Sequence, residues 1–249
     1  MRSAESSGEL GSGWGLTLYP EAGEAGGRYY GSGERSEIRG EVEPDPGRSE
    51  VEAARRARGK LRRYGAAHRL NRLGTLTYAS PGCQDPLALR SDLARFFRSL
   101  RGSLGGDAFP YVWVPEWHKT GHGLHAHFAV GRYVRRELIE EAWGQGFVHI
   151  KLIGDLPVGS AALEEARVAA RYLAKYAGKA FDVARLKGLH RYEVAEGFQP
   201  RAERLFGRRL DDVIDKASER MGRAPSVRWT SADAPRWRSP PAVWLAWGA

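Results

Sequence analysis

The feature that most constrains the fold is a regular alternation of strand-like and helix-like segments between residues 73 and 178. Short runs rich in β-branched and aromatic residues predict strands, and longer runs with apolar residues at helical spacing predict helices. The expected strands cover 73–78, 109–114, 124–130 and 147–153, and the expected helices cover 85–102, 135–143 and 161–178. This β-α-β-β-α-β-α order predicts an α+β fold of the ferredoxin or RRM kind, an antiparallel sheet with helices packed mainly on one face.

The segments on either side of this region differ from it in composition. Residues 1–49 hold 11 of the 31 glycines and a net charge of −4, and a segment with so little apolar periodicity is expected to be disordered. Residues 50–199 are expected to form the folded domain. Residues 200–249 are expected to be an irregular extension rich in Trp and Pro, whose aromatic side chains pack onto that domain or stack on bases. The tryptophans concerned are Trp229, Trp237, Trp244 and Trp247.

The positive charge of the chain belongs to the expected folded part. The whole chain carries +9, so residues 50–249 carry +13, which favours a polyanionic partner. Residues 50–72 predict a basic helix, weakened by Gly59 and Gly65. This helix is either a solvated face or a phosphate-binding face. The candidate DNA-binding residues are Arg55, Arg56, Arg58, Lys60, Arg62 and Arg63.

Several classes of protein are excluded by what the sequence lacks. The single cysteine, Cys83, excludes an internal disulfide framework and a Cys-rich zinc finger. No apolar run is long enough for a transmembrane helix, and the first residues do not resemble an export signal. We therefore expect a cytoplasmic protein with no membrane partner. No GxxxxGK[ST] motif is present, so no helicase activity is expected from this chain.

Two histidines in the expected strand 124–130 form the first chemical signal. Side chains alternate between the faces of a strand, so His125 and His127 point to the same side. Two imidazoles in this arrangement can share a divalent ion, or they can simply be exposed histidines.

A carboxylate precedes these histidines across a glycine-containing turn. Glu116 lies nine residues before His125, and a hairpin of that length can fold it back beside both imidazoles. The resulting set suits Mg²⁺ or Mn²⁺, although a transition metal is also compatible. Alternatively Glu116 is a solvated charge at a strand end. His118 and His122 lie in the same turn and are competing ligands.

The last expected helix carries paired tyrosines and lysines in YLAKYAGK. Tyr172 and Tyr176 are four residues apart and project from one face. Lys175 and Lys179 each follow a tyrosine by three residues. Tyrosines at this spacing often pack in a core, but an ammonium beside a phenol favours the phenolate and stabilises phosphate charge.

Together these segments resemble the HUH endonuclease superfamily, in particular rolling-circle replication initiators with two tyrosines, such as phage gene A-type and plasmid or prophage replication proteins. The LTLTY segment at 73–78 resembles the first motif of that family, HAH resembles the second and YLAKYAGK the third. The resemblance covers about residues 55–199. The chain departs from the family pattern at Leu124, where proline is common, and at Ala126, where a bulkier residue is common.

The resemblance implies a metal-dependent nickase that acts on single-stranded origin DNA. Tyr172 or Tyr176 would attack the phosphate, leaving a 5′-phosphotyrosyl link and a free 3′-OH, while Lys175 and Lys179 stabilise charge. Glu116, His125 and His127 would hold the metal. A host helicase and polymerase would be partners. The alternatives are a transposase of the same superfamily, an inactive initiator, and a non-catalytic RRM-like nucleic-acid-binding protein.

Overall fold

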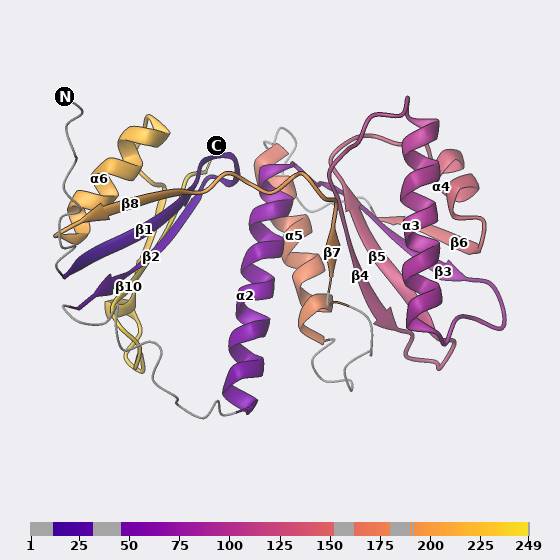
Figure 1. Cartoon of the computed structure of the whole chain (residues 1–249), viewed down its shortest axis with the longest axis horizontal. Coiled ribbons are helices and arrows are strands. Elements are labelled where there is room, and N and C mark those ends of the chain that lie inside the picture. The colour runs from indigo at the N-terminus through magenta and orange to yellow at the C-terminus, as the bar shows by residue number, and fades with distance from the viewer. Residues whose placement is uncertain (1–11, 32–45, 152–161, 180–189, 191, 249) are drawn as a thin grey trace, which may run out of the picture. The chain divides into compact units, whose positions relative to one another are not determined.

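The computed structural model describes residues 12–31, 46–151, 162–179, 190 and 192–248. The chain divides into two compact units, the first formed by Met1–Glu43 with Arg201–Gly248 and the second by Pro44–Pro200. Each unit contains a five-stranded antiparallel sheet and helices, so the fold is α+β (Figure 1).

The second unit has the element order that the sequence predicts. Its elements are α2 (Pro46–Ala67), β3 (Arg72–Tyr78), α3 (Pro86–Ser103), β4 (Tyr111–Trp117), β5 (Leu124–Val130), α4 (Arg136–Trp143), β6 (Gly146–Lys151), α5 (Ala162–Lys179) and β7 (Glu193–Val194). From β3 to α5 this is β-α-β-β-α-β-α. The sheet order is β6-β3-β5-β4-β7, and every neighbouring pair is antiparallel. This arrangement confirms the ferredoxin-like prediction.

Local sequence accounts for the boundaries of α3 and for the hairpin that follows it. The Asp85 carboxylate accepts a hydrogen bond from the Leu87 N–H, and Pro86 occupies the first turn, where its missing N–H costs nothing. Before β5, Gly123 has a φ of 104°, and a Cβ there would lie 2.2 Å from the Cys83 carbonyl oxygen. Only glycine fits this turn, which sets where β5 begins.

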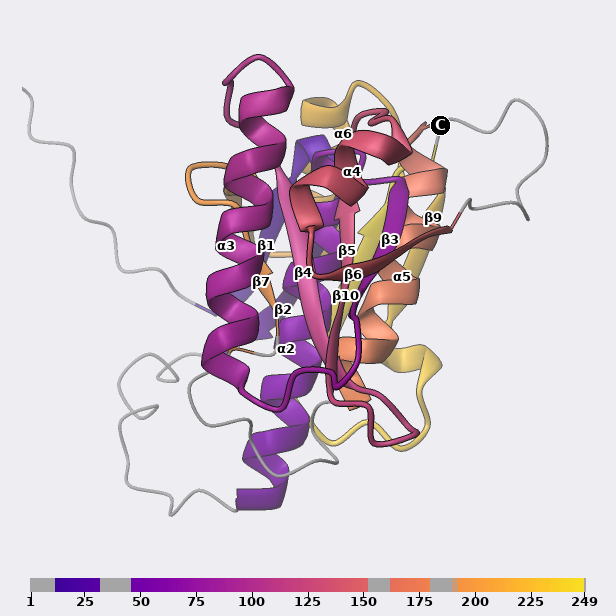
Figure 2. The same cartoon turned by 90° about the vertical axis from the view of Figure 1, so that its right-hand side faces the viewer.

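Helices cover both faces of the second sheet, so the expectation that they pack mainly on one face is wrong. The helices α3 and α4 pack on the face that carries Ala126 and Phe128. Leu61 of α2 and Leu173 of α5 pack on the opposite face with Ala129. Figures 1 and 2 show the sheet between these two pairs of helices. The alternation of strand side chains explains the result, because both sets of β5 residues are apolar and each needs a cover.

The close contact between α2 and α5 depends on a glycine that was expected to weaken the helix. A Cβ at Gly65 would lie 3.0 Å from the Cβ of Ala170, so the two small residues let the helices approach closely. The packing gained there offsets the low intrinsic helix propensity of glycine.

The first unit is built from strands at both ends of the chain. Its elements are β1 (Gly13–Tyr19), β2 (Glu24–Tyr30), β8 (Glu203–Gly207), α6 (Leu210–Met221), β9 (Val227–Thr230) and β10 (Ala242–Ala246). The sheet order is β8-β1-β2-β10-β9. One face packs on α6 through an apolar cluster that includes Leu18, Val213 and Leu245.

Two sequence-based expectations are therefore wrong. Residues 13–30 form paired strands rather than disordered chain, and the C-terminal region is a helix with three strands rather than an irregular tail. β1 pairs with β8 and β2 with β10, so each strand is stabilised by residues far away in the sequence. Residues 1–11 and 32–45 of the expected disordered segment lie outside the described residues. Among the described helices, none has the length and apolar character needed to span a bilayer.

Candidate metal and tyrosine site

Strand register brings Glu116 beside the two histidines. In the β4–β5 hairpin, Glu116 lies directly opposite His125, and Val114 lies opposite His127. Directly opposed residues of antiparallel strands share a face, so the carboxylate and both imidazoles converge. The hairpin predicted from the sequence therefore forms, and it closes the nine-residue gap as expected.

The three side chains converge through one atom each. Oε2 of Glu116 lies 3.2 Å from Nε2 of His125 and 2.9 Å from Nε2 of His127. The two Nε2 atoms are 3.2 Å apart. Among the described residues, Glu116, His125 and His127 form the group whose ligand atoms lie close enough together to hold a metal ion.

The donor atoms fit a small divalent cation in spacing as well as in type. An octahedral ion with ligands at roughly 2.1 Å has adjacent ligands about 3.0 Å apart, and the three donors are separated by 2.9–3.2 Å. Two imidazole nitrogens and one carboxylate oxygen on one side leave the opposite positions open for water or a substrate oxygen. The group can therefore hold a metal ion.

Both imidazoles are held in an environment that favours the neutral, metal-binding form. His125 and His127 are each only 7% exposed. Burial, reinforced by the neighbouring His127, lowers the pKa of His125 to about 4, although Glu116 acts in the opposite direction. Nδ1 of His125 is buried with no hydrogen-bond partner among the described residues, so the polar contacts of this ring run through Nε2.

A threonine on the neighbouring strand orients His127. Oγ1 of Thr75 lies 3.0 Å from Nδ1 of His127, and the two residues are directly opposed in the β3–β5 pair. A hydrogen bond at Nδ1 leaves Nε2 directed toward Glu116 and sets the ring plane. Thr75 belongs to the LTLTY segment, which gives this segment a physical role that the sequence analysis did not assign.

Tyr172 lies against the metal-binding group from the side of α5. Its ring centroid is 6.5 Å from that of His127, with the planes nearly perpendicular. Both residues line a pocket of about 220 Å³, whose other walls are formed by β3, β6 and Leu173 of α5. A tyrosine and a possible metal site thus share one cavity.

The remaining residues of the tyrosine helix are placed less fully. Lys175 lies in α5 and is exposed. Tyr176 and Lys179 also lie within the helix, but their side chains fall outside the described part of the structure. The expected common face of Tyr172 and Tyr176 stays a prediction.

The two turn histidines that competed as ligands make other contacts. Nδ1 of His118 lies 2.6 Å from Oγ1 of Thr120. Nε2 of His122 lies 2.9 Å from the Tyr78 carbonyl oxygen. Both histidines therefore stabilise the turn, and neither belongs to the converging group.

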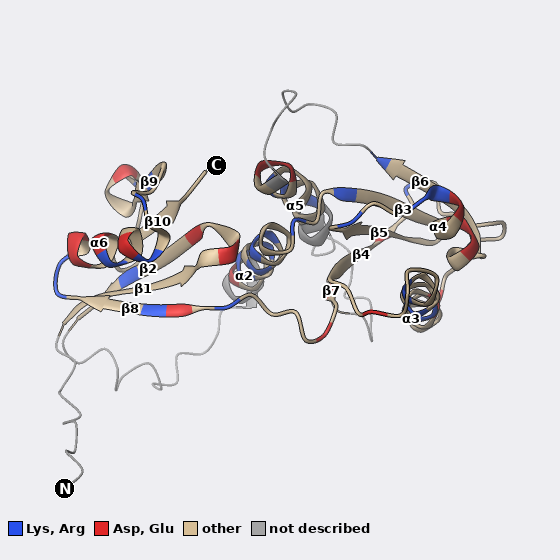
Figure 3. Cartoon of the chain, turned by 90° about the horizontal axis from the view of Figure 1, so that it is seen from above, with Lys and Arg blue, Asp and Glu red and all other residues tan. Residues whose placement is uncertain are grey.

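The basic residues of α2 lie on its solvent side. Leu61 and Tyr64 are buried, whereas Arg55, Arg56, Arg58 and Lys60 are exposed. Arg62 and Arg63 are partly buried. Arg56 forms an ion pair with Glu52 of the same helix, at 3.8 Å. Figure 3 shows the Lys and Arg positions along α2. A role for them in DNA binding stays a prediction.

The sequence analysis missed three residues near the group. Thr75, His149 and Lys151 all line the pocket that holds His127 and Tyr172. The period-two pattern of β6 could have indicated that His149 and Lys151 share a face, but only the strand register shows which face it is. Nζ of Lys151 lies 4.1 Å from the centroid of the Tyr172 ring.

Comparison with known proteins gives one match, and it falls on this region. Residues 71–181 match the model of a replication-associated protein family of the ORF2 type. The match begins at β3 and ends just after α5, so it contains Glu116, both histidines and both tyrosines. No curated protein and no solved structure matches the chain. This part of the chain is similar to replication-associated proteins, which supports a role in DNA replication.

Proposed function

We propose that this protein is a replication initiator that cuts and rejoins single-stranded DNA by transesterification at a tyrosine. The observation that carries the proposal is the shared pocket: His127 of the converging Glu116–His125–His127 group and Tyr172 line the same cavity. The similarity of residues 71–181 to replication-associated proteins supports the choice of DNA as substrate.

The Glu–His–His group accounts for the dependence on a divalent ion. When bound, Mg²⁺ or Mn²⁺ supplies polarisation of the scissile phosphate and orients it. Glu116 provides the negative charge that a hard cation prefers, and the two neutral imidazoles complete one side of the site. Thr75 keeps His127 in the required orientation through its hydrogen bond to Nδ1.

The chemical step exchanges one phosphodiester for another. The phenol oxygen of Tyr172 or Tyr176 forms a bond to phosphorus, and the bond between phosphorus and the 3′-oxygen breaks. The phenol loses its proton, and the departing 3′-oxygen gains one. The products are a 5′-phosphotyrosyl link and a free 3′-OH, and attack of a 3′-OH on that link reverses the step. Lys175 and Lys179 are suited to stabilising the phosphate charge.

The exchange fits rolling-circle replication because the phosphodiester energy is kept in the covalent link. The free 3′-OH can prime a host polymerase while a host helicase opens the duplex. The second tyrosine can then act when a round of copying ends. The exposed basic residues of α2 are suited to holding the DNA backbone, with an affinity that falls as salt rises.

The test is capture of the covalent intermediate. Full-length protein is incubated with Mn²⁺ or Mg²⁺ and a pool of labelled single-stranded oligonucleotides of random sequence, and denaturing gels then detect labelled protein. We expect adducts with the native chain and none with Tyr172→Phe/Tyr176→Phe. The single Tyr→Phe variants show which tyrosine acts first.

The matched control is Tyr133→Phe, which changes an exposed tyrosine outside the pocket. It should form adducts at the native level. Adducts that persist in the double tyrosine variant, or that form in EDTA, would contradict the proposal. Binding without adducts in every protein would favour a non-catalytic nucleic-acid-binding protein, and joining of the cut end to a second DNA without replication would favour a transposase.

A further inference from the structure

The edge strand β6 carries an aromatic and two basic-type residues on the face that holds the metal-binding group. Residues of a strand alternate between faces, so Phe147, His149 and Lys151 point to the same side. Phe147 is directly opposite Thr77, and Thr77 is directly opposite His125. The three residues therefore form one column, and its side chains share the face of the His125 and His127 imidazoles.

Two rows of side chains join this column to the metal-binding group. One row runs across the sheet from Glu116 through His125 and Thr77 to Phe147. The next row runs from His127 through Thr75 to His149. Each row crosses adjacent strands, which lie about 4.8 Å apart. The column is thus two strands away from the histidines, on the outer edge of the sheet.

The column is open to solvent. Phe147 is 69% exposed, and His149 and Lys151 are also exposed. An exposed phenylalanine loses the stability that burial would provide, so it is an unusual residue for an edge strand. The side chains of His149 and Lys151 reach the pocket that contains His127 and Tyr172. The column therefore leads from solvent to the cavity.

Lys151 ties this column to the tyrosine. Its ammonium lies over the Tyr172 ring, with Nζ 4.1 Å from the centroid, which is the geometry of a cation–π contact. An ammonium in this position is close to any phosphate that the phenol could reach. The same cation can therefore position the tyrosine and neutralise phosphate charge.

We propose that Phe147, His149 and Lys151 form a binding track for single-stranded DNA, which rests on the proposed function and specifies how its substrate is held. Lys151 and His149 contact backbone phosphates beside the scissile one, and Phe147 stacks on a base. Alternate residues on a strand are about 6.6 Å apart, a spacing comparable to that of successive nucleotides in an extended single strand.

The chemistry of the column selects a single strand rather than a duplex. The face of a base is available for stacking on Phe147 only when the base is unpaired and unstacked. A phosphate backbone is the ligand that an exposed lysine and histidine next to an aromatic ring would hold, because the cations follow the charge and the ring takes the base. A duplex would offer the phosphates but not the base face.

The experiment measures DNA affinity apart from chemistry. Full-length protein in EDTA is titrated into labelled oligothymidylate, and fluorescence anisotropy is followed at several salt concentrations. Phe147→Ala should weaken binding about tenfold with an unchanged salt dependence, as expected for a lost stacking contact. Lys151→Ala should make the slope of log K against log salt shallower by about 0.7, as expected for one lost phosphate contact. His149→Ala should weaken binding by less than either.

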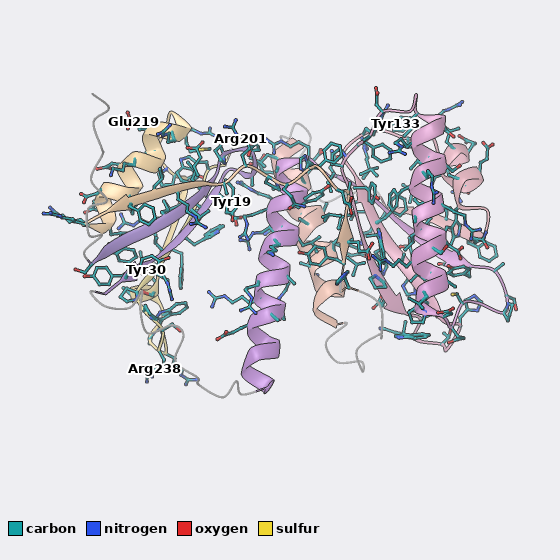
Figure 4. All side chains as sticks on the ribbon, viewed as in Figure 1. Tyr19, Tyr30, Tyr133, Arg201, Glu219 and Arg238 are labelled. Carbon is teal, nitrogen blue, oxygen red and sulfur yellow. The ribbon has the colours of Figure 1, made fainter. Side chains whose placement is uncertain are left out.

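Two control variants lie away from the column. Tyr133→Ala removes another exposed aromatic, 72% exposed (Figure 4). Arg98→Ala removes an exposed cation from α3, on the opposite face of the sheet. Both should bind oligothymidylate as the native chain does. Circular dichroism spectra establish that each variant is folded.

The outcomes separate the track from the proposed function. If Phe147→Ala and Lys151→Ala bind like the controls while the native chain forms covalent adducts, the track is wrong and the nickase stands. If they bind weakly while no protein forms adducts, the track stands and the nickase is wrong. Native binding to duplex as tight as to a single strand, or displacement of the DNA by neither salt nor competitor single strands, overturns the track.

Discussion

The two units use the same kind of sheet for different purposes. Both sheets have five antiparallel strands, but the residues buried on them differ. The sheet of the first unit packs an apolar cluster on α6. That of the second unit buries His125 and His127 beside Glu116, next to its apolar clusters. All seven histidines of the chain lie between residues 68 and 190, which is within the second unit.

The difference teaches where this protein accepts a cost in stability. A buried polar group is costly unless it is satisfied, and buried imidazoles beside a carboxylate are not needed to hold a sheet together. The first unit has Glu24 as its buried charged residue among those described. The concentration of polar groups in the second unit is therefore best explained by a ligand, and the following predictions test that explanation.

The largest expected effect is loss of metal binding when both imidazoles are removed. His125→Ala/His127→Ala should weaken Mn²⁺ binding more than about 100-fold, because even the loss of an outer hydrogen-bond partner costs 10–100-fold. Isothermal titration calorimetry measures the affinity. Glu24→Gln, which changes the buried carboxylate of the other sheet, should leave it unchanged. Equal losses in both variants would remove the distinction between the sheets.

A glycine substitution in the first unit should destabilise that unit and spare the metal site. A Cβ at Gly27 would lie 2.1 Å from the Gly15 carbonyl oxygen, so Gly27→Ala should lower the free energy of unfolding by about 3 kcal/mol. At Gly26 the nearest atoms are 3.9 Å away, and Gly26→Ala should be neutral or slightly stabilising. Urea denaturation followed by tryptophan fluorescence tests both. A large loss of Mn²⁺ affinity in Gly27→Ala would indicate that the units are coupled.

Acid should destabilise the metal-free second unit through His125. An unfolded histidine takes up a proton near pH 6.5, whereas the folded pKa of His125 is about 4. Stability is therefore unaffected above pH 6.5 and falls as the pH drops from 6.5 to 4, by roughly 2 kcal/mol at pH 5. Urea denaturation at pH 7 and pH 5 measures the change. The His125→Gln variant should lose less stability over this interval, and an identical loss in both proteins would refute the assignment.

The smallest effect is expected at the residue that orients His127. Thr75→Val keeps the side-chain shape but removes the hydroxyl that lies 3.0 Å from Nδ1, and Mn²⁺ affinity should fall about tenfold. The matched control is Thr17→Val, on β1 of the first unit. It should not change the affinity. An unchanged affinity in Thr75→Val would mean that packing alone orients the ring.

Local patterns carried most of the second unit. Apolar spacing placed its strands and helices, and the alternation of strand side chains placed His125 and His127 on one face. A single hairpin was enough to bring Glu116 to them, because the contact spans only nine residues. The first unit could not be found in this way, since β1 is paired with β8 and β2 with β10 across most of the chain.

The chain's amino-acid order alone determined the α+β succession from β3 to α5, the metal-binding trio and the tyrosine helix, because each rests on contacts or periodicities within a few residues. Tertiary structure decided the rest. It set which helices cover which face, and it joined both ends of the chain in one sheet. It also brought Thr75, His149 and Lys151 to the pocket beside Tyr172. These depend on strand order and register, which arise only when distant segments bury their apolar surface together.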